Sequence, residues 1–539
     1  MQERIRQQAE EFITQETQFH LGFLPTEQSN PLTKTLEQDF KRSPADGVRT
    51  LQRVDRNVLE MARRVLASEE YTRLVDAGLR TIREGGRIIF SGCGATGRLS
   101  ILLEAMWRTA CAEHPEAAKL ADQVESIMTG GDYALVRSVE FFEDYASFGR
   151  RQVAEAKMTA KDLLVAITEG GETSSVLGTV AEAADRGAGV FLLFNNPADL
   201  LASRLERCRR AITDPRVCVL DLHCGPMALA GSTRMQATTS EQLIAGAALE
   251  TVLHRLLGKP ERDYAADFGT LLDALEAEAN VQAIADYMAF EADIYRNQGK
   301  LTYFANDFLL DIFTDTTERS PTFMLPPFRR RDNKTAPQSW AFVKNPLVAT
   351  PDAWNRSMRR PLRCLNWTAE DYTAMGAGEK ISSRPPALAA ADLLQFAIGQ
   401  EDLEERYDSG RDAAVLIAMR NAPELEAAFV DASGKFAHTA RLAIDTELSD
   451  AFQIMTGVDS GTLKLMQHLA LKLVLNTVST GTMALLGRIT GNWMSWVDCT
   501  NKKLLDRGAR LLVEIAGVDY RTACENLFAA LEEIQKVPE

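Results

Sequence analysis

Residues 70–255 alternate between short apolar runs and longer amphipathic segments. Segments such as LVDAGLRTIREGG and SSVLGTVAEAADRG carry apolar residues at helical spacing and end at glycine, which predicts helices. The predicted strands are RIIFSG, QVESIMTGG, DLLVAITEGG, GVFLLFNNP and VCVLDL. Short apolar strands that alternate with helices are typical of a parallel sheet with helices on both faces. The predicted fold class of this region is therefore α/β.

A weaker copy of this pattern follows in the second half. The helix AIADYMAFEADIYRNQGK leads through glycine into the strand LTYFAND, and DAAVLIAMRN and ARLAIDTEL predict later strands. Residues 324–405 contain several prolines and predict a long, loop-rich insertion at the surface. In each half a Ser/Thr-rich start leads into a long apolar helix, at 231–253 and 460–483. These shared patterns favour an internal duplication, although any helix that follows a sheet could resemble another.

A chain of 539 residues is too long for one ordinary core, so we expect more than one domain. The patterns predict an N-terminal helical segment (1–60), a first α/β domain (61–260), a second α/β domain (261–500) with the insertion at about 324–405, and a C-terminal helical cap (501–539).

Composition narrows the function classes. The net charge of −15 argues against non-specific nucleic-acid binding, which needs clustered cations. The eight cysteines and six histidines are dispersed without a CxxC pair or a metal-ligand spacing, so we expect reduced thiols, no metal and no cofactor. The polar N-terminus and the lack of an apolar run of about 20 residues predict a cytoplasmic protein without a membrane span.

The most informative local feature is the run Arg-Ile-Ile-Phe-Ser-Gly-Cys-Gly-Ala-Thr-Gly-Arg at 87–98, a strand, a glycine-rich bend and a helix start. Glycines let the backbone approach a ligand, and the N-terminus of the helix attracts an anion. Gly94, Thr96 and Gly97 are the candidate phosphate-binding residues. A dinucleotide is disfavoured because the next strand ends in Met-Thr-Gly-Gly rather than in an acidic residue. A glycine turn without a ligand remains an alternative.

Two further loops have a similar character. Thr168, Gly170 and Glu172 lie in a second glycine-rich strand end, and Ser232 lies in a third loop before a helix. Loops on parallel strands converge at the carboxyl edge of the sheet, where open α/β sheets bind ligands. Helix capping and a surface position are the alternatives for these side chains.

Charged residues add weaker candidates. Glu143 lies in the acidic run SVEFFEDYASF, and Lys503 and Arg507 are four residues apart, so they share one helix face. Each group could bind a ligand or simply face water.

Four segments together resemble a known family: SGCGATGRLSILLEA, MTGGDYALVRSVEFFEDY, CGPMALAGSTRMQ and LVLNTVSTGTMALLGRITGNWMSWVDCTNKKLLDR. They are similar to the N-acetylmuramic acid 6-phosphate etherases and, equally, to the glucokinase regulatory protein, which carries two sugar isomerase (SIS) domains. The resemblance covers most of residues 28–525 except the insertion. It implies two SIS-type parallel-sheet domains, and the doubled layout favours the regulatory-protein branch.

The resemblance also implies roles for individual residues. The first loop (Gly94, Thr96, Gly97) and the second loop (Thr168, Gly170, Glu172) would bind phosphate, although etherases have serine in place of Gly170. Glu143 matches one glutamate of the etherase pair. The second glutamate is missing from the first half, where Met106 stands, but Glu318 in TTERSPTF matches it. Lys503 and Arg507 resemble sugar-phosphate ligands of the regulatory protein.

Each half thus lacks what the other retains, because the second half has YFAND in place of a glycine loop. We expect one composite site in an internal pseudo-dimer, with Glu143 from the first domain and Glu318 from the second. The first functional hypothesis is a sugar-phosphate sensor that acts on a partner such as a sugar kinase. The alternative is a carbon–oxygen lyase, an etherase that eliminates lactate with Glu143 as base and Glu318 as acid. A sugar-phosphate isomerase is a third, weaker alternative.

Overall fold

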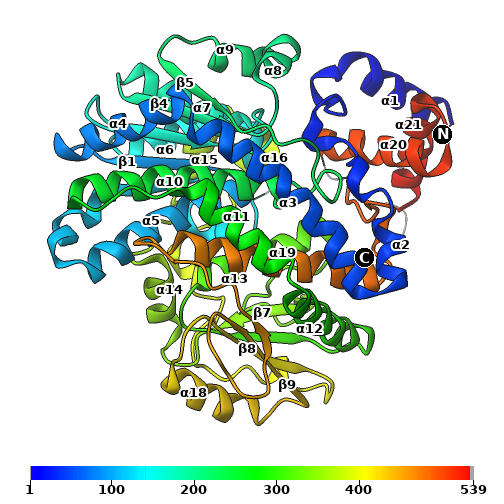
Figure 1. Cartoon of the computed structure of the whole chain (residues 1–539). Helices are drawn as coiled ribbons and strands as arrows, with labels where there is room; N and C mark the ends of the chain where they lie inside the picture. The colour runs from blue at the N-terminus through cyan, green and yellow to red at the C-terminus, as the bar shows by residue number, and fades with distance from the viewer. Residues whose placement is uncertain (1, 140, 500, 535–539) are drawn as a thin grey trace.

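The computed structural model describes residues 2–139, 141–499 and 501–534 and contains two five-stranded parallel sheets, one above the other in Figure 1. The strands of the first sheet are β1 (Ile88–Gly92), β2 (Val124–Met128), β3 (Leu163–Ile167), β4 (Gly189–Phe194) and β5 (Val217–Asp221). Those of the second are β6 (Leu301–Phe304), β7 (Ala341–Lys344), β8 (Ala413–Ala418), β9 (His438–Ile444) and β10 (Phe452–Ile454). The predicted fold class, two parallel-sheet α/β domains, is confirmed.

Both sheets have the same strand order. The first runs β2-β1-β3-β4-β5, and the second, read from β7, runs β7-β6-β8-β9-β10. In each sheet the second strand along the chain (β2 or β7) lies on one side of the first strand, and the third strand (β3 or β8) lies on its other side. Such a switch point opens a crevice beyond the carboxyl ends of the two central strands. In the first sheet these are β1 and β3, the strands that precede the two glycine-rich loops.

Helices cover both faces of the first sheet. Ile88 and Phe90 of β1 belong to one apolar cluster and Ile89 to another, as expected when successive side chains of a strand point to opposite faces.

The longer helices are α1 (Gln2–Gln15), α3 (Pro44–Leu66), α4 (Glu69–Arg83), α5 (Ala95–Glu113), α6 (Ala146–Glu155), α7 (Ser174–Asp185), α10 (Gln236–Leu257), α11 (Tyr264–Leu275), α12 (Glu278–Arg296), α13 (Leu309–Phe323), α18 (Pro423–Ser433), α19 (Leu465–Leu485), α20 (Lys502–Ala516) and α21 (Tyr520–Ile534).

Shorter elements connect these helices and strands. They are α2 (Leu36–Arg42), α8 (Ala198–Arg204), α9 (Glu206–Ile212), α14 (Thr350–Met358), α15 (Ala369–Ala374), α16 (Glu379–Ser382), α17 (Ala390–Leu393), the antiparallel pair β11 (Ile489–Thr490) and β12 (Trp493–Met494), and the 3-10 turns η1 (Thr17–Phe19), η2 (Pro25–Glu27), η3 (Pro31–Thr33), η4 (Pro115–Gln123), η5 (Asp132–Leu135), η6 (Phe142–Asp144) and η7 (Glu404–Arg406).

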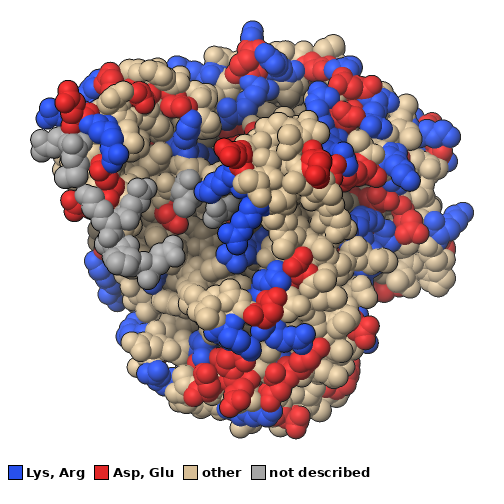
Figure 2. Space-filling model, turned by 180° about the vertical axis from the view of Figure 1, so that it is seen from behind, with Lys and Arg blue, Asp and Glu red and all other residues tan. Residues whose placement is uncertain are grey.

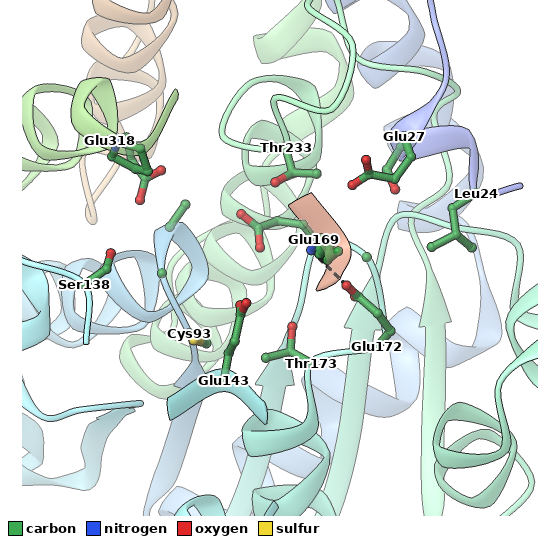
Figure 3. Close-up of a pocket in the computed structure, with 16 residues that line it drawn as sticks. Leu24, Glu27, Cys93, Ser138, Glu143, Glu169, Glu172, Thr173, Thr233 and Glu318 are labelled. Atoms are coloured by element: carbon green, nitrogen blue, oxygen red, sulfur yellow. Dashed lines mark hydrogen bonds and ion pairs between the residues drawn. The ribbon is translucent and has the colours of Figure 1, made fainter. Parts of the chain in front are cut away.

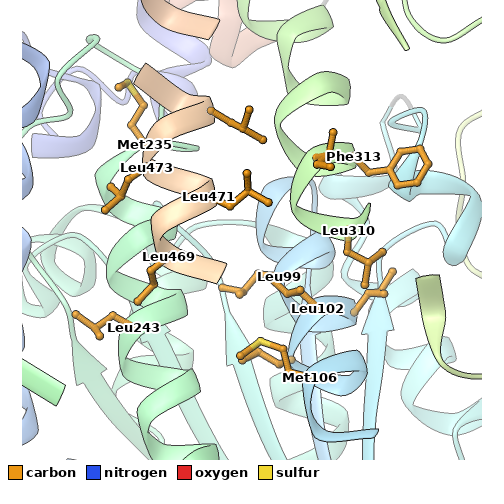
Figure 4. Packing of buried hydrophobic residues seen from close by; sticks show 14 of the residues in the cluster. Leu99, Leu102, Met106, Met235, Leu243, Leu310, Phe313, Leu469, Leu471 and Leu473 are labelled. Atoms are coloured by element: carbon orange, nitrogen blue, oxygen red, sulfur yellow. The ribbon is translucent and has the colours of Figure 1, made fainter. Parts of the chain in front are cut away.

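The two domains share one hydrophobic core. Helices from both halves form a layer between the sheets, and Figure 4 shows how their apolar side chains interdigitate. Leu99 of α5 and Leu243 of α10 come from the first half, and Leu310 of α13 and Leu471 of α19 come from the second; all four lie in the same buried cluster. Burial of apolar area on this scale is the dominant stabilising term in folding, so the halves are held as one unit.

The chain ends form a smaller helical unit. Phe12 of α1 packs with Ala509 of α20 and with Ala523 and Cys524 of α21 in a separate apolar cluster. The first 60 residues are therefore divided between this unit, which contains α1, and the layer between the sheets, which contains α3 (Figure 1).

No helix among the described residues is long and apolar enough to cross a membrane. On the face shown in Figure 2, acidic and basic side chains are interspersed.

The segment 324–405 differs from a loop-rich surface insertion. Residues 341–344 form β7, an edge strand of the second sheet. The rest reaches back to the first domain, where Arg360 donates hydrogen bonds to Glu104 (3.0 Å) and Asp132 (2.7 Å), all of them almost fully buried. The proline-rich pattern concealed this contact because it is made by residues far apart in the sequence.

Candidate functional site

A cavity of about 200 Å³ lies beyond the carboxyl ends of β1 and β3. Its walls come from the first domain, from α13 of the second domain, from α20 and from the N-terminal segment before η3. They are Leu24, Thr26, Glu27, Cys93, Gly94, Ala95, Ser138, Glu143, Glu169, Gly170, Glu172, Thr173, Thr233, Glu318, Pro321 and Lys503 (Figure 3). A water molecule occupies about 30 Å³ of the liquid, so the cavity has room for a small molecule rather than a polymer.

The first glycine loop brings bare backbone to this cavity. Gly94 has φ 58° and ψ −125°, a conformation that essentially only glycine adopts, and a Cβ there would meet only open space. A Cβ on Gly92 would lie 2.4 Å from the backbone of Thr96, so the close approach of α5 to β1 requires glycine. Within the described residues, α5 begins without a side-chain cap. The N–H groups of its first turn are therefore offered to a ligand.

The second loop repeats this arrangement at the start of α7. Gly171 has φ 82°, and Thr173 occupies the N-cap position without a side-chain cap hydrogen bond among the described residues. The Glu172 side chain curls back over Gly170, where a Cβ would lie 2.3 Å from Oε2. Two helix N-termini therefore converge on the cavity from neighbouring strands.

The segment around Glu143 is held in place by the returning part of 324–405. Phe142 stacks on Trp367 with ring centroids 6.2 Å apart, and Phe148 meets the same ring edge-on at 5.5 Å. The hydroxyl of Tyr145 accepts a hydrogen bond from the Gly378 N–H at 3.0 Å. Aromatic pairs of this kind stabilise beyond their buried area. The second half therefore fixes the position of a first-half glutamate.

Glu318 reaches the same cavity from α13. Its carboxylate accepts a hydrogen bond from Arg98, which lies in the first turn of α5 and is only 1% exposed. Arg98 also donates to the Leu135 carbonyl oxygen at 2.7 Å, so its guanidinium is fixed from the first domain. The ion pair between Arg98 and Glu318 joins the two halves at the wall of the cavity.

Ion pairs dominate one side of the cavity. Lys503 donates to Glu172 at 2.9 Å. Arg507 donates to both carboxylate oxygens of Glu27, at 2.7 and 3.1 Å, and Arg510 donates to one of them. Burial alone would raise the pKa of Glu172, but the charges of Lys503 and Arg207, together with the hydrogen bond from Lys503, outweigh burial, and the pKa is lowered. In the same way Arg507, Lys503 and Arg510 overcome burial and lower the pKa of Glu27 to about 2. Both carboxylates are therefore ionised at neutral pH.

The opposite side carries carboxyl groups of different character. The carboxylates of Glu143, Glu169 and Glu318 face a common space in Figure 3. Burial, reinforced by the negative charge of Glu318, raises the pKa of Glu169 to about 7. Burial is also the main cause that raises the pKa of Glu143. A carboxyl group with a pKa of about 7, such as Glu169, suits proton transfer near neutral pH, and the pKa of Glu143 is shifted in the same direction.

The structure brings six of the predicted residues to the cavity wall: Gly94, Glu143, Gly170, Glu172, Glu318 and Lys503. The others lie behind it. The Thr96 hydroxyl bonds to the backbone of Cys93, Gly97 packs against Met128, and Thr168 bonds to Thr173. Arg507 is engaged by Glu27, and Ser232 is buried, with its hydroxyl unpaired among the described residues.

Sequence reasoning missed four residues of the site. Glu27 comes from η2, which shows no periodic signal, and Arg98 stands at the end of the glycine motif, where its side chain has no predicted role. Glu169 stands within the second loop, beside three residues that were chosen, and Thr233 follows Ser232 directly. Glu169 had one signal in the sequence. It lies just beyond a buried strand, and a carboxyl group is costly to bury unless it has a partner or a function.

Comparisons with known proteins agree with this picture. The family model for the glucokinase regulatory protein N-terminal SIS domain matches residues 70–184. N-acetylmuramic acid 6-phosphate etherase 1 of Bacillus licheniformis is 29% identical over 260 residues, 48% of this chain and 78% of the relative. An etherase of Trichormus variabilis is 33% identical over 222 residues, 41% of this chain and 65% of the relative.

An etherase of Thermosynechococcus vestitus is 31% identical over 256 residues, which cover 47% of this chain and 76% of that protein. The matched region covers more than two thirds of that relative. The chain therefore belongs to the N-acetylmuramic acid 6-phosphate etherase family.

Proposed function

We propose that the protein binds a sugar phosphate in one composite site between its two halves. The observation that carries this proposal is that Gly94 and Gly170 of the first domain line the same cavity as Glu318 of the second. The uncapped N-termini of α5 and α7 would hold the phosphate, and Lys503 would supply a positive charge. Family membership supports the ligand class, because the relatives are named for a 6-phosphorylated amino sugar.

The shared strand order supports an origin by duplication, in which the halves form an internal pseudo-dimer. In this proposal the second half has given up its own phosphate loop and keeps α13 to complete the site of the first. Thr96, Gly97, Thr168 and Ser232 would then shape the loops from behind, and Arg507 would hold Glu27 rather than the ligand.

A second candidate function is etherase chemistry at this site, favoured by the presence of Glu143 and Glu318 on one cavity. In the elimination, Glu143 would take the proton from carbon 2, and the electron pair would form a double bond to carbon 3. The bond to the lactyl oxygen would break as Glu318 protonates that oxygen, and water would then add to the double bond. General acid–base groups typically contribute on the order of 100- to 10,000-fold each.

The first experiment separates these functions. The protein is titrated calorimetrically with N-acetylmuramic acid 6-phosphate while D-lactate is assayed. Lactate release that falls about 100-fold or more in Glu143→Gln and in Glu318→Gln, with binding retained, would establish the lyase. Binding without release would favour the sensor, and a sugar kinase would then be assayed with and without the bound sugar phosphate. Absence of binding by any hexose phosphate would refute the composite site.

A further inference from the structure

A third loop, residues 231–235, leads into α10 and brings Thr233 to the wall of the cavity. The next residue is Arg234, whose side chain is almost fully buried. Its guanidinium donates hydrogen bonds to three side chains of the second half: Asp315 (3.1 Å), Ser479 (3.1 Å) and Thr480 (2.9 Å). A buried cation of the first half is therefore neutralised and bound by α13 and α19 of the second.

The backbone of the third loop is held from the same side. Lys472 of α19 donates hydrogen bonds to the carbonyl oxygens of Arg234 at 3.1 Å and of Met235 at 3.2 Å. Met235 also belongs to the same buried apolar cluster as Leu473 of α19 (Figure 4). The loop therefore owes its conformation to contacts with the second half.

Two arginines of the first half contact α13 one turn apart. Arg234 pairs with Asp315, and Arg98 pairs with the carboxylate three residues further along, that of Glu318. Residues three apart lie on the same side of a helix. The Asp315 side chain is 2% exposed, whereas that of Glu318 is 13% exposed and lines the cavity. The first ion pair is thus fully buried and holds α13 in place, because a buried charge is costly without its partner. The second reaches the ligand space.

Thr233 and Glu318 lie in the upper part of the cavity in Figure 3. Cys93 and Thr173, which belong to the two glycine-rich loops, lie in the lower part of Figure 3. These loops would hold the phosphate of a ligand, so its sugar would extend toward the upper part. Arg234 is connected to both residues there, since it follows Thr233 in the chain and its ion-pair partner lies one turn from Glu318.

We propose that Arg234 is a positioning residue that ties the third loop to α13 and thereby sets the places of Thr233 and Glu318 around the sugar of the ligand. This inference rests on the proposed sugar-phosphate site and deepens it. The side-chain hydrogen bonds of Arg234 go to α13 and α19 rather than to the glycine-rich loops. Its loss should therefore disturb recognition of the sugar more than binding of the phosphate.

Calorimetry with two ligands tests this inference: N-acetylglucosamine 6-phosphate, which has no lactyl ether to cleave, and inorganic phosphate. In Arg234→Met we expect the affinity for the sugar phosphate to fall by about tenfold or more, roughly 1.4 kcal/mol, and that for inorganic phosphate to change by about twofold or less. Arg234→Lys should recover part of the loss, because it keeps the charge but not the planar set of donors.

Two further variants keep the outcome clear. Arg406→Met is the matched control, because Arg406 is also a buried arginine but donates to Thr302 and the Leu301 carbonyl oxygen, at the amino end of the second sheet. It should lower stability in urea and leave the ratio of the two affinities unchanged. Thr480→Val removes one acceptor of Arg234 with little change of shape, and should weaken sugar-phosphate binding by about threefold even if Arg234→Met does not fold.

Three results would overturn the inference and leave the sugar-phosphate site standing. They are an equal loss of affinity for both ligands in Arg234→Met, unchanged sugar-phosphate affinity in Thr480→Val, and a ratio that shifts as much in Arg406→Met as in Arg234→Met. Failure of the wild-type protein to bind any hexose phosphate would instead refute the proposed function itself.

Discussion

At the carboxyl end of β1 the first half has Gly92 and Gly94, and at the corresponding positions of the second half, beyond β6, stand Ala305 and Asp307. The correspondence follows from register, because Ile88 and Leu301 each pair with the first residue of the next central strand. In the second half, Asn345 donates to Asn306 at 3.0 Å and Arg420 to Asp307 at 2.6 Å. Side chains there satisfy one another where the first half leaves backbone groups free for a ligand.

The comparison shows that topology alone does not make a binding site. Both halves have the switch point, yet a loop that binds an anion through its backbone also needs glycines between the strand and the helix. Arg98 of the first half and Glu318 of the second join the two halves, and residues of both line the cavity. Five substitutions test how the two halves share the site.

The largest effect is expected from Arg98→Met, which leaves Glu318 without its partner. Breaking one side of a buried ion pair typically costs about 3–5 kcal/mol, so urea denaturation should show a loss of this order. The double variant Arg98→Met with Glu318→Leu should recover part of it, because the unpaired charge is removed as well. A single variant as stable as the wild type would mean that the two halves are not coupled here.

Gly94→Asp gives the first glycine loop the residue that the second half has at the corresponding position, Asp307. It introduces a carboxylate at the N-terminus of α5 and forces a side chain into a glycine conformation, with φ 58°. Sugar-phosphate binding measured by calorimetry should weaken by about 100-fold, roughly 2.8 kcal/mol. Gly94→Ala serves as the uncharged control and should lose less. Undiminished binding would remove the first loop from the proposed phosphate site.

The pH dependence of stability distinguishes the two sides of the cavity. The pKa of Glu169 is raised from 4.5 to about 7, so the folded state binds an extra proton between these values and stability falls as the pH rises through them. Relative to the wild type, Glu169→Gln should therefore gain stability across this range, by an amount on the order of 1.4 kcal/mol for each unit of pKa shift.

Glu27 has the opposite sign. Its pKa is lowered from 4.5 to about 2, so its contribution to stability is complete above 4.5 and is lost as the pH falls toward 2. Urea denaturation should therefore show that the free energy of unfolding falls less between pH 4.5 and 2 in Glu27→Gln than in the wild type. The same pH trend in both variants would contradict the opposite pKa shifts of Glu27 and Glu169.

The smallest effect is expected in the second half. Asp307→Asn removes an ion pair with Arg420, whose side chain is 59% exposed. Exposed ion pairs contribute about 0–1 kcal/mol, so the free energy of unfolding should fall by no more than about 1 kcal/mol. Sugar-phosphate affinity should remain the same within error. A large loss of affinity would reveal a ligand contact at the loop after β6.

The sequence by itself determined the two parallel sheets, because apolar strands and glycine-ended helices are local patterns that burial and backbone geometry impose. It also identified Gly94, Glu143, Gly170, Glu172, Glu318 and Lys503, which line one cavity. Only the tertiary structure decided that Arg98 meets Glu318, that Arg507 faces Glu27, and that Trp367 supports the turn of Glu143. These contacts join residues far apart in the chain, and their partners depend on how the domains pack, which no local pattern encodes.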